Sequence, residues 1–332
     1  MDSQVVEHGV QPVLEALKDT PAEIASSTYY AHKSRPPSAR LIRDEIWTEE
    51  IKQVHTSNFE VYGARKVWHE MRRQGRVIAR CTVERLMRAE GLKGVVRDKH
   101  PRTTKPAAET DRPCDLVKRD FTAARPNELW VADLTYVRTT SGWVYAAFVL
   151  DVYSRMIVGW QVSTSLYTEL ALDALRMGIW RRAHAGQDVA GLVHHSDRGV
   201  QYRALRYTQR LDEADAVASV GSKGDSYDNA MAEALNSLFK AELIRGPARR
   251  RTGLWRGIDD LEIAVAEWVD WYNERRLHGE LGHVPPAEYE AAYWAGQHEH
   301  PDNEHDQDDS QTRAGAASHA NTGPVLATAE TN

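Results

Sequence analysis

The stretch SYDNAMAEALNSLFKAELI, residues 226–244, decides how the chain is organised. It contains no Gly or Pro, and Met231, Leu235 and Leu238 recur at helical spacing, so we predict an amphipathic helix. A polar line on another face of this helix is formed by Asn229, Glu233, Asn236 and Lys240. Such a line is commonly a solvated surface, so it indicates a site only if other acidic residues lie opposite it.

β-rich segments precede this helix. Short turns at Ser141-Gly142 and Ser154-Arg155 separate three of them, which predicts three antiparallel strands. The strand segments are 129–139, 143–154, 156–165, 191–197 and 216–225, and the helical segments of this part are 168–185, 204–214 and 259–276. Strands that later alternate with helices predict an α/β fold, with a mixed five-stranded sheet flanked by helices.

Asp133 lies inside the first of these strands. It shares a face with Val131 and Val137, and a buried carboxylate there is costly unless it is paired or binds a metal. A salt bridge with Arg155 or Arg138 is the alternative interpretation.

Asp197 ends an apolar strand, and Glu233 lies on the polar line of the helix described above. Each has an ordinary explanation, a turn-forming Asp and a solvated helical Glu. Together with Asp133 they form a trio of carboxylates suited to two divalent metals about 3.5–4 Å apart. Oxygen ligands favour Mg²⁺ or Mn²⁺ over zinc.

The front of the chain is helical and basic. Residues 39–94 predict three helices that suit a helix-turn-helix module, with Arg80, Arg85 and Arg88 as candidate DNA contacts; a generic helical bundle is the alternative. Residues 1–38 predict an N-terminal arm with two short helices broken at Thr20-Pro21. Residues 95–126 read as a basic, Pro-containing linker that either tracks DNA or is a solvated tether.

Charge is segregated along the 332 residues, whose net charge is −6. The tail, residues 296–332, holds seven acids and one base, so 1 − 7 = −6, and we expect it to be disordered. Residues 35–120 hold 20 Lys/Arg against 13 Asp/Glu, a local +7, which suits binding to DNA phosphates. An ordinary surface rich in Arg is the alternative.

The motifs resemble those of one family. The spacing of Asp133, Asp197 and Glu233, with 35 residues between the last two and Lys240 seven beyond, looks like the DD(35)E(K) signature of transposases and retroviral-type integrases. The segments WVADLTYV, HHSDRGVQY, WYNERRLHGELGHVPPAEYE and VYGARKVWHEMRRQGRVIARCTVERLMRAEGL resemble OrfB transposases of bacterial insertion sequences. The resemblance runs from about residue 10 to residue 295.

The resemblance implies a ribonuclease-H-like integrase core at residues 127–295. It implies that Asp133, Asp197 and Glu233 are catalytic and bind two Mg²⁺ or Mn²⁺ ions, and that Lys240 contacts DNA, with Asn229 and His195 as weaker candidates. The expected reaction is cleavage at element ends followed by strand transfer into target DNA. The expected partners are DNA with terminal inverted repeats, further copies of the chain, and the first-reading-frame protein of the same element.

Two rival functions differ from this expectation. A nuclease would cut DNA without joining it, and a non-catalytic DNA-binding regulator of transposition would bind without cutting. The first twelve residues lack a signal-peptide pattern, and no apolar run reaches the roughly 20 residues of a membrane span. The only cysteines are Cys81 and Cys114. We therefore expect a cytoplasmic, nucleoid-associated protein with no membrane partner.

Overall fold

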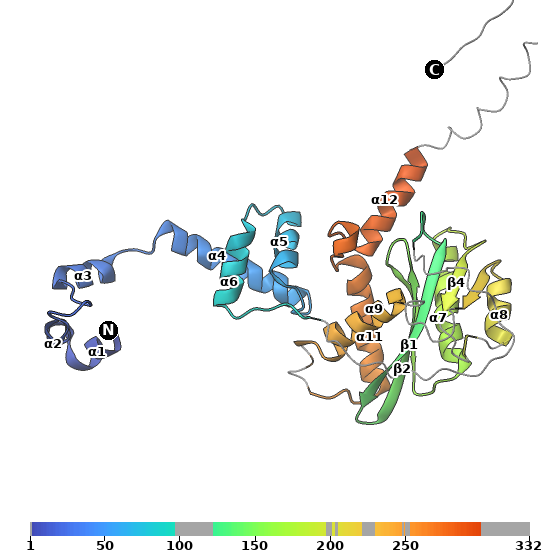
Figure 1. Cartoon of the computed structure of the whole chain (residues 1–332), viewed down its shortest axis with the longest axis horizontal. Helices are drawn as coiled ribbons and strands as arrows, with labels where there is room; N and C mark the ends of the chain where they lie inside the picture. The colour runs from blue at the N-terminus through green and yellow to red at the C-terminus, as the bar shows by residue number, and fades with distance from the viewer. Residues whose placement is uncertain are drawn as a thin grey trace, which may run out of the picture.

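The structure is a computed structural model. It describes residues 2–96, 122–196, 201–202, 205–220, 230–247, 249 and 253–299. Among these residues, N-terminal helices lie far from the core, a helical module follows, and an α/β core forms the largest part (Figure 1).

The core is built on a five-stranded mixed sheet, as predicted. Its strands are β1 (Leu129–Thr139), β2 (Gly142–Asp151), β3 (Ile157–Ser163), β4 (Val193–Ser196) and β5 (Val217–Val220). They are ordered β3-β2-β1-β4-β5. β1, β2 and β3 are antiparallel neighbours, whereas β4 runs parallel to β1 and β5 parallel to β4. β1 is therefore the central strand, where the antiparallel and parallel halves meet.

Helices cover both faces of this sheet. They are α7 (Thr168–His184), α8 (Leu205–Asp212), α9 (Ala230–Phe239), the π-helix η2 (Lys240–Ile244), α11 (Ile258–Glu274), the short η3 (Gly279–Leu281) and α12 (Pro286–Glu299). Successive strand residues point to opposite faces. Trp130 and Ala132 therefore pack in the cluster with α7 and α8, whereas Val131 and Val137 pack in the cluster with α9 and α11.

The helical module consists of α4 (Ala39–Ser57), α5 (Ala64–Arg73) and α6 (Arg80–Ala89). The three predicted helices are confirmed, but the first buries apolar side chains only in its C-terminal half. Ile51 and Val54 are buried, whereas Ile42 and Ile46 are 47% and 55% exposed. The reason is that the N-terminal half of α4 extends beyond α5 and α6 (Figure 1).

The N-terminal segment differs from its prediction. It forms three short helices, α1 (Asp2–His8), α2 (Val10–Ala16) and α3 (Ser26–Ser34). Thr20 does not begin a helix, because its hydroxyl donates to the carbonyl of Leu17 at 2.6 Å and the next helix starts at Ser26.

A buried ion cluster holds the unpredicted helix α12 on the core. Arg182 of α7 lies 3.3 Å from Asp151 of β2 and also pairs with Glu290 of α12, and all three side chains are buried. Burial raises the pKa of Asp151, although the charge of Arg182 opposes the shift. The cluster therefore joins β2 of the sheet and helix α7 to the C-terminal helix α12.

Candidate active site

Asp133 lies on the central strand, half-buried on the face that packs against α9. The Asp133 carboxylate accepts a hydrogen bond of 2.9 Å from the Asn236 side chain and one of 2.8 Å from the backbone N–H of Leu134. The described parallel ladder between β1 and β4 ends at the pair Ala132–Ser196, one residue before Asp133. Asp133 thus stands at the end of the parallel half of the sheet.

Glu233 is brought to the same strand by α9. This helix buries Leu235 and Phe239, and the Phe239 ring packs 5.1 Å from the ring of Phe148 on β2. Asn236, which contacts Asp133, lies one turn after Glu233, and residues three apart are neighbours on a helix surface. Glu233 is exposed on this side of the helix. The predicted polar line is therefore the line that faces β1.

Asn236 belongs to the predicted polar line, but nothing in its sequence context indicates that it contacts Asp133. Its side chain is only 8% exposed, and its Nδ2 is used by the bond to Asp133. Its Oδ1 has no hydrogen-bond partner in the described part of the chain. A buried acceptor without a partner is costly, so this oxygen is available to a cation or donor that enters the site.

Lys240 follows Asn236 by one helical turn. Its ammonium lies 4.9 Å from the ring centroid of Tyr136, three residues beyond Asp133 on β1. Lys240 begins the π-helix η2, a rare element that occurs frequently at functional sites. The predicted DNA-contact residue is therefore placed along the same strand as the predicted catalytic acid.

A buried ion pair fixes η2. Arg276 and Glu242 are 5% and 7% exposed, and their closest nitrogen–oxygen distance is 2.6 Å. Burial alone would lower the pKa of Arg276, but the charge of Glu242 and the hydrogen bonds that Arg276 donates to it raise the pKa. Arg276 therefore keeps its charge, and its pairing with Glu242 anchors the element that carries Lys240.

The helical module docks next to this ion pair. The backbone N–H of Leu277 donates to the Tyr62 hydroxyl at 2.7 Å, and the Trp271 indole donates to Asn58 at 2.9 Å. The ring of Phe59 lies 5.0 Å from that of Trp271. These contacts connect the module to the end of α11 and so to the π-helix.

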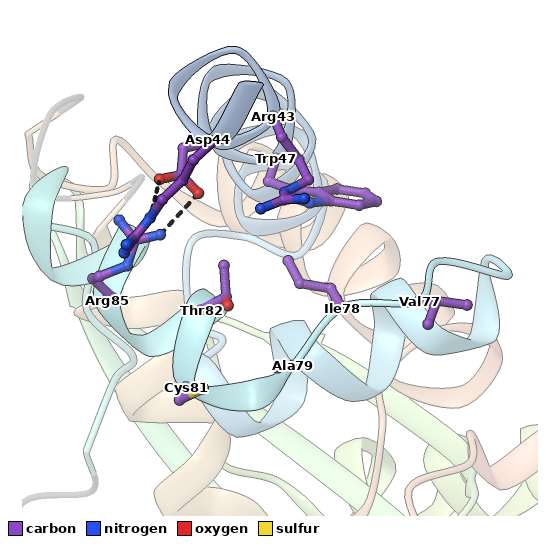
Figure 2. Close-up of a pocket in the computed structure, with 10 residues that line it drawn as sticks. Arg43, Asp44, Trp47, Val77, Ile78, Ala79, Cys81, Thr82 and Arg85 are labelled. Carbon is purple, nitrogen blue, oxygen red and sulfur yellow. Dashed lines mark hydrogen bonds and ion pairs between the residues drawn. The ribbon is translucent and has the colours of Figure 1, made fainter. Parts of the chain in front are cut away.

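The candidate DNA contacts of the module lie on α6. Arg80 pairs with Glu84 at 2.9 Å, Arg85 pairs with Asp44 at 2.8 Å, and Arg88 is exposed. Arg85 lines a cavity of about 580 Å³ between α4 and α6 (Figure 2). Its other lining residues include Arg40, Arg43, Trp47 and Thr82. Asp44, which pairs with Arg85 in Figure 2, also pairs with Arg40 at 3.8 Å.

His195 is a packed strand residue rather than a surface contact. It is fully buried on β4, and its Nδ1 lies 2.9 Å from the hydroxyl of Ser219 on β5. The preceding His194 lies 3.1 Å from the Tyr207 hydroxyl, and burial lowers the pKa of His194 to about 3. Both rings therefore belong to the structure of the sheet.

Asp197 and Asn229 lie outside the described residues, as do most of the predicted linker and the tail from residue 300. Within the described residues, no three His, Cys, Asp or Glu side chains come together as a metal site. Two of the three predicted acids are therefore placed by the structure, on β1 and α9.

Comparisons with protein families classify this fold. The integrase core domain matches residues 123–226 and 216–286, and an HTH-like domain matches residues 42–100. These matches define the class as proteins with a ribonuclease-H-like integrase core and a helix-turn-helix module.

Close relatives carry transposase names. The chain is 52% identical to the putative transposase for insertion sequence element IS986/IS6110 of Mycobacterium tuberculosis, over 82% of this chain and 96% of that protein. It is 48% identical to the transposase for IS629 of Shigella sonnei, over 89% of this chain and 96% of that protein. The chain therefore belongs to the insertion-sequence transposases of the OrfB type, as the motifs predicted.

A solved structure with a similar core is the HTLV-2 integrase catalytic core domain in complex with magnesium. It covers 51% of this chain and 99% of its own, with 13% identity and a TM-score of 0.40.

Among the described residues, no helix is long and apolar enough to cross a membrane.

Proposed function

We propose that this transposase cleaves the ends of its DNA element and joins them to target DNA at a site formed by Asp133, Asp197 and Glu233. One observation carries the proposal: Asn236 holds α9, which bears Glu233, against Asp133 on the central strand. Asp197 is the next residue in the sequence after Ser196, which pairs with Ala132 beside Asp133. Asp133 and Glu233 are therefore carried by two elements in contact, and Asp197 follows in the sequence directly after the strand that pairs with β1.

A divalent metal fits the donors of this site. The Asp133 carboxylate is half-buried, Glu233 lies one turn from Asn236, and the buried Oδ1 of Asn236 has no partner among the described residues. All these donors are oxygens, which Mg²⁺ and Mn²⁺ prefer. We propose that the three acids hold two such ions. When bound, the ions supply stabilisation of the attacking and leaving oxygens of an in-line displacement.

The chain's own residues orient this chemistry. Asn236 and the Leu134 N–H fix the Asp133 carboxylate, so its oxygens need no reorganisation when DNA binds. Lys240, one turn further along, supplies a positive charge to a phosphate beside the cut. Water then attacks phosphorus as the O3′ leaves and takes up a proton. The freed 3′-OH attacks a second phosphodiester in the same way, with no covalent enzyme intermediate.

Joining two element ends requires that both be held in one assembly. We therefore propose that at least two copies of the chain bind DNA together, through the helical module and Lys240. The first-reading-frame protein of the same element is a further proposed partner, and the bacterial nucleoid is the proposed location. The net positive charge of residues 35–120 supports a DNA-binding role for the front of the chain.

The test is cleavage of labelled duplex DNA that carries the inverted repeats flanking the element, with Mg²⁺, Mn²⁺ or chelator. We expect new 3′-OH ends with either metal and none with chelator. Glu233→Gln should lower the rate by at least about 100-fold, because it removes a proposed ligand while keeping the side-chain shape.

Glu262→Gln is the matched control, since Glu262 is an exposed Glu on α11. It should cleave like the wild type. Binding without cleavage in any metal, both for this chain and for a form fused to the upstream reading frame, would instead establish the DNA-binding regulator.

A further inference from the structure

The hairpin of β1 and β2 exposes two aromatic rings close to the proposed active site. Tyr136 and Trp143 are 47% and 46% exposed, and their ring centroids are 5.3 Å apart in an edge-to-face arrangement. Large exposed apolar side chains that cluster commonly mark a binding surface. We call these two residues, with Arg138 and Lys240, the aromatic edge.

The cations of the aromatic edge rest on its rings. The Arg138 guanidinium lies 5.5 Å from the Trp143 ring centroid, and the Lys240 ammonium lies 4.9 Å from that of Tyr136. A cation over a ring is attracted by the ring but keeps its full charge. The surface therefore offers flat faces for stacking together with positive charge for phosphate.

A further cation is attached to the tip of the hairpin. Ser141 and Thr140 donate side-chain hydrogen bonds of 2.6 and 2.8 Å to the carbonyl of Arg256, whose own side chain is 86% exposed. The loop that carries Arg256 is thereby held beside the hairpin tip, where the Arg256 guanidinium pairs with Asp260 at 3.6 Å.

The aromatic edge follows the acidic site along β1. Tyr136 is three residues beyond Asp133, roughly 10 Å along an extended strand, so the two side chains leave opposite faces of β1. Asn236 contacts Asp133 and the Lys240 ammonium lies over the Tyr136 ring, so the helical segment that carries both residues reaches the acid and the ring. Within the described residues, β4 pairs only with Leu129–Ala132, so β1 beyond Asp133 has β2 as its sheet neighbour.

We propose that the aromatic edge binds unpaired nucleotides of the DNA strand that is processed at the acidic site, with their bases stacked on Tyr136 and Trp143. Aromatic rings interleaved with cations are the chemistry that single-stranded DNA requires, since bases stack on the rings while phosphates meet the cations. Bases within a duplex have both faces covered, so binding here requires a DNA end that is opened. The inference rests on the proposed function and adds how the end is held.

A purely structural role is the alternative. Arg138 and Trp143 are directly opposite each other on β1 and β2, and such cross-strand pairs stabilise hairpins by themselves. That role predicts lower stability of the variants and equal losses for every form of DNA, whereas stacking predicts a loss confined to unpaired ends.

The experiment measures equilibrium binding of the full chain to fluorescent DNA in chelator. The probes are one duplex bearing the inverted repeat with a blunt end, and the same duplex with its last few base pairs replaced by mismatches. We expect the wild type to prefer the opened end. Trp143→Ala should weaken binding to the opened end by about tenfold and leave the blunt end nearly unchanged.

Two further variants make the result decisive. Trp143→Phe keeps an aromatic face and should retain most of the preference. Trp180→Ala removes a more exposed ring, 64% exposed and stacked on His184 of α7, and should bind both probes like the wild type.

Equal losses for both probes, no effect of Trp143→Ala, or an equal effect of Trp180→Ala would each overturn the stacking proposal. Metal-dependent cleavage of the blunt duplex is scored separately. Cleavage without a preference for opened ends defeats only the stacking proposal, whereas absence of cleavage by both this chain and its upstream fusion defeats the proposed function.

Discussion

The helical module pairs several of its cations with acids, whereas both cations of the aromatic edge rest on rings; on α5 of the module, Lys66 and Arg72 also lie over rings. On the module, basic side chains meet acids, in the pairs Arg76–Glu50, Arg80–Glu84, Arg85–Asp44 and Lys52–Glu90. On the aromatic edge, Arg138 and Lys240 rest on rings. An acid offsets the positive charge of its basic partner, whereas a ring leaves the charge of the cation available to a DNA phosphate. We therefore expect each cation of the edge to contribute more to DNA binding than each paired cation of the module.

The largest expected effect concerns the buried ion pair of Arg276 and Glu242, which anchors the π-helix that begins at Lys240. Arg276→Ala would leave Glu242 buried without its partner and should lower the free energy of unfolding by about 3–5 kcal/mol. Denaturant unfolding measures this change. Arg80→Ala, which breaks an exposed pair with Glu84, should cost under about 1 kcal/mol. Similar costs for the two variants would show that Arg276 does not anchor the π-helix.

The next expected effect is a loss of stability at low pH, and it concerns His194, which is buried on β4. The pKa of His194 is about 3 in the folded chain and about 6.5 when exposed, so its stabilising effect is present above pH 6.5 and is lost as pH falls. Lowering the pH from 7 to 5 should therefore reduce the free energy of unfolding by about 2 kcal/mol through this residue. Denaturant unfolding of His194→Gln should show a correspondingly flatter pH dependence, and an unchanged slope would contradict the assignment.

Lys240→Gln tests the charge of the aromatic edge directly. Because the charge of Lys240 is not cancelled by its ring partner, the variant should lose about tenfold in DNA affinity and lower the salt slope by about one. Arg80→Gln provides the comparison on the module and should lose less, since Glu84 already offsets Arg80. The DNA affinities of both variants are measured across salt concentrations. An equal loss of DNA affinity in Arg80→Gln and Lys240→Gln would contradict the contrast between the two regions.

The smallest expected effect comes from releasing a paired cation of the module. Asp44→Asn removes the acid that faces Arg85 and Arg40, so DNA affinity should rise a few-fold and the salt slope should increase. Asp173→Asn, which frees Arg176 on α7 instead, should leave DNA affinity unchanged. A decrease in affinity for Asp44→Asn would mean that the acid orients the arginines rather than offsetting them.

The sequence predicted the elements whose side chains repeat regularly. The strands β1 to β3 and the helix α7 lie within a few residues of their predicted bounds, because alternation and helical spacing are local properties. Asp133 was recognisable because a carboxylate interrupts an apolar strand.

Other features depend on distant partners and left no local pattern. The bond between Asn236 and Asp133 joins residues 103 positions apart. The π-helix η2 is only five residues long, which is too short a segment to show in the spacing of apolar side chains. Helix α12 is held by Glu290 in the ion cluster and by Tyr289 and Tyr293 against Tyr153, rather than by an apolar stripe. The exposure of Ile42 and Ile46 depends on where α4 leaves its neighbours.

The most direct test of the central claim is strand transfer from a duplex whose end already carries a free 3′-OH into a supercoiled plasmid. The account predicts joined products with Mg²⁺ or Mn²⁺, lost in both Asp133→Asn and Glu233→Gln and retained in Glu262→Gln. Joined products from either acidic variant at the wild-type rate would contradict the proposed site. Cleavage of an intact end without any joining would identify a nuclease instead of a transposase.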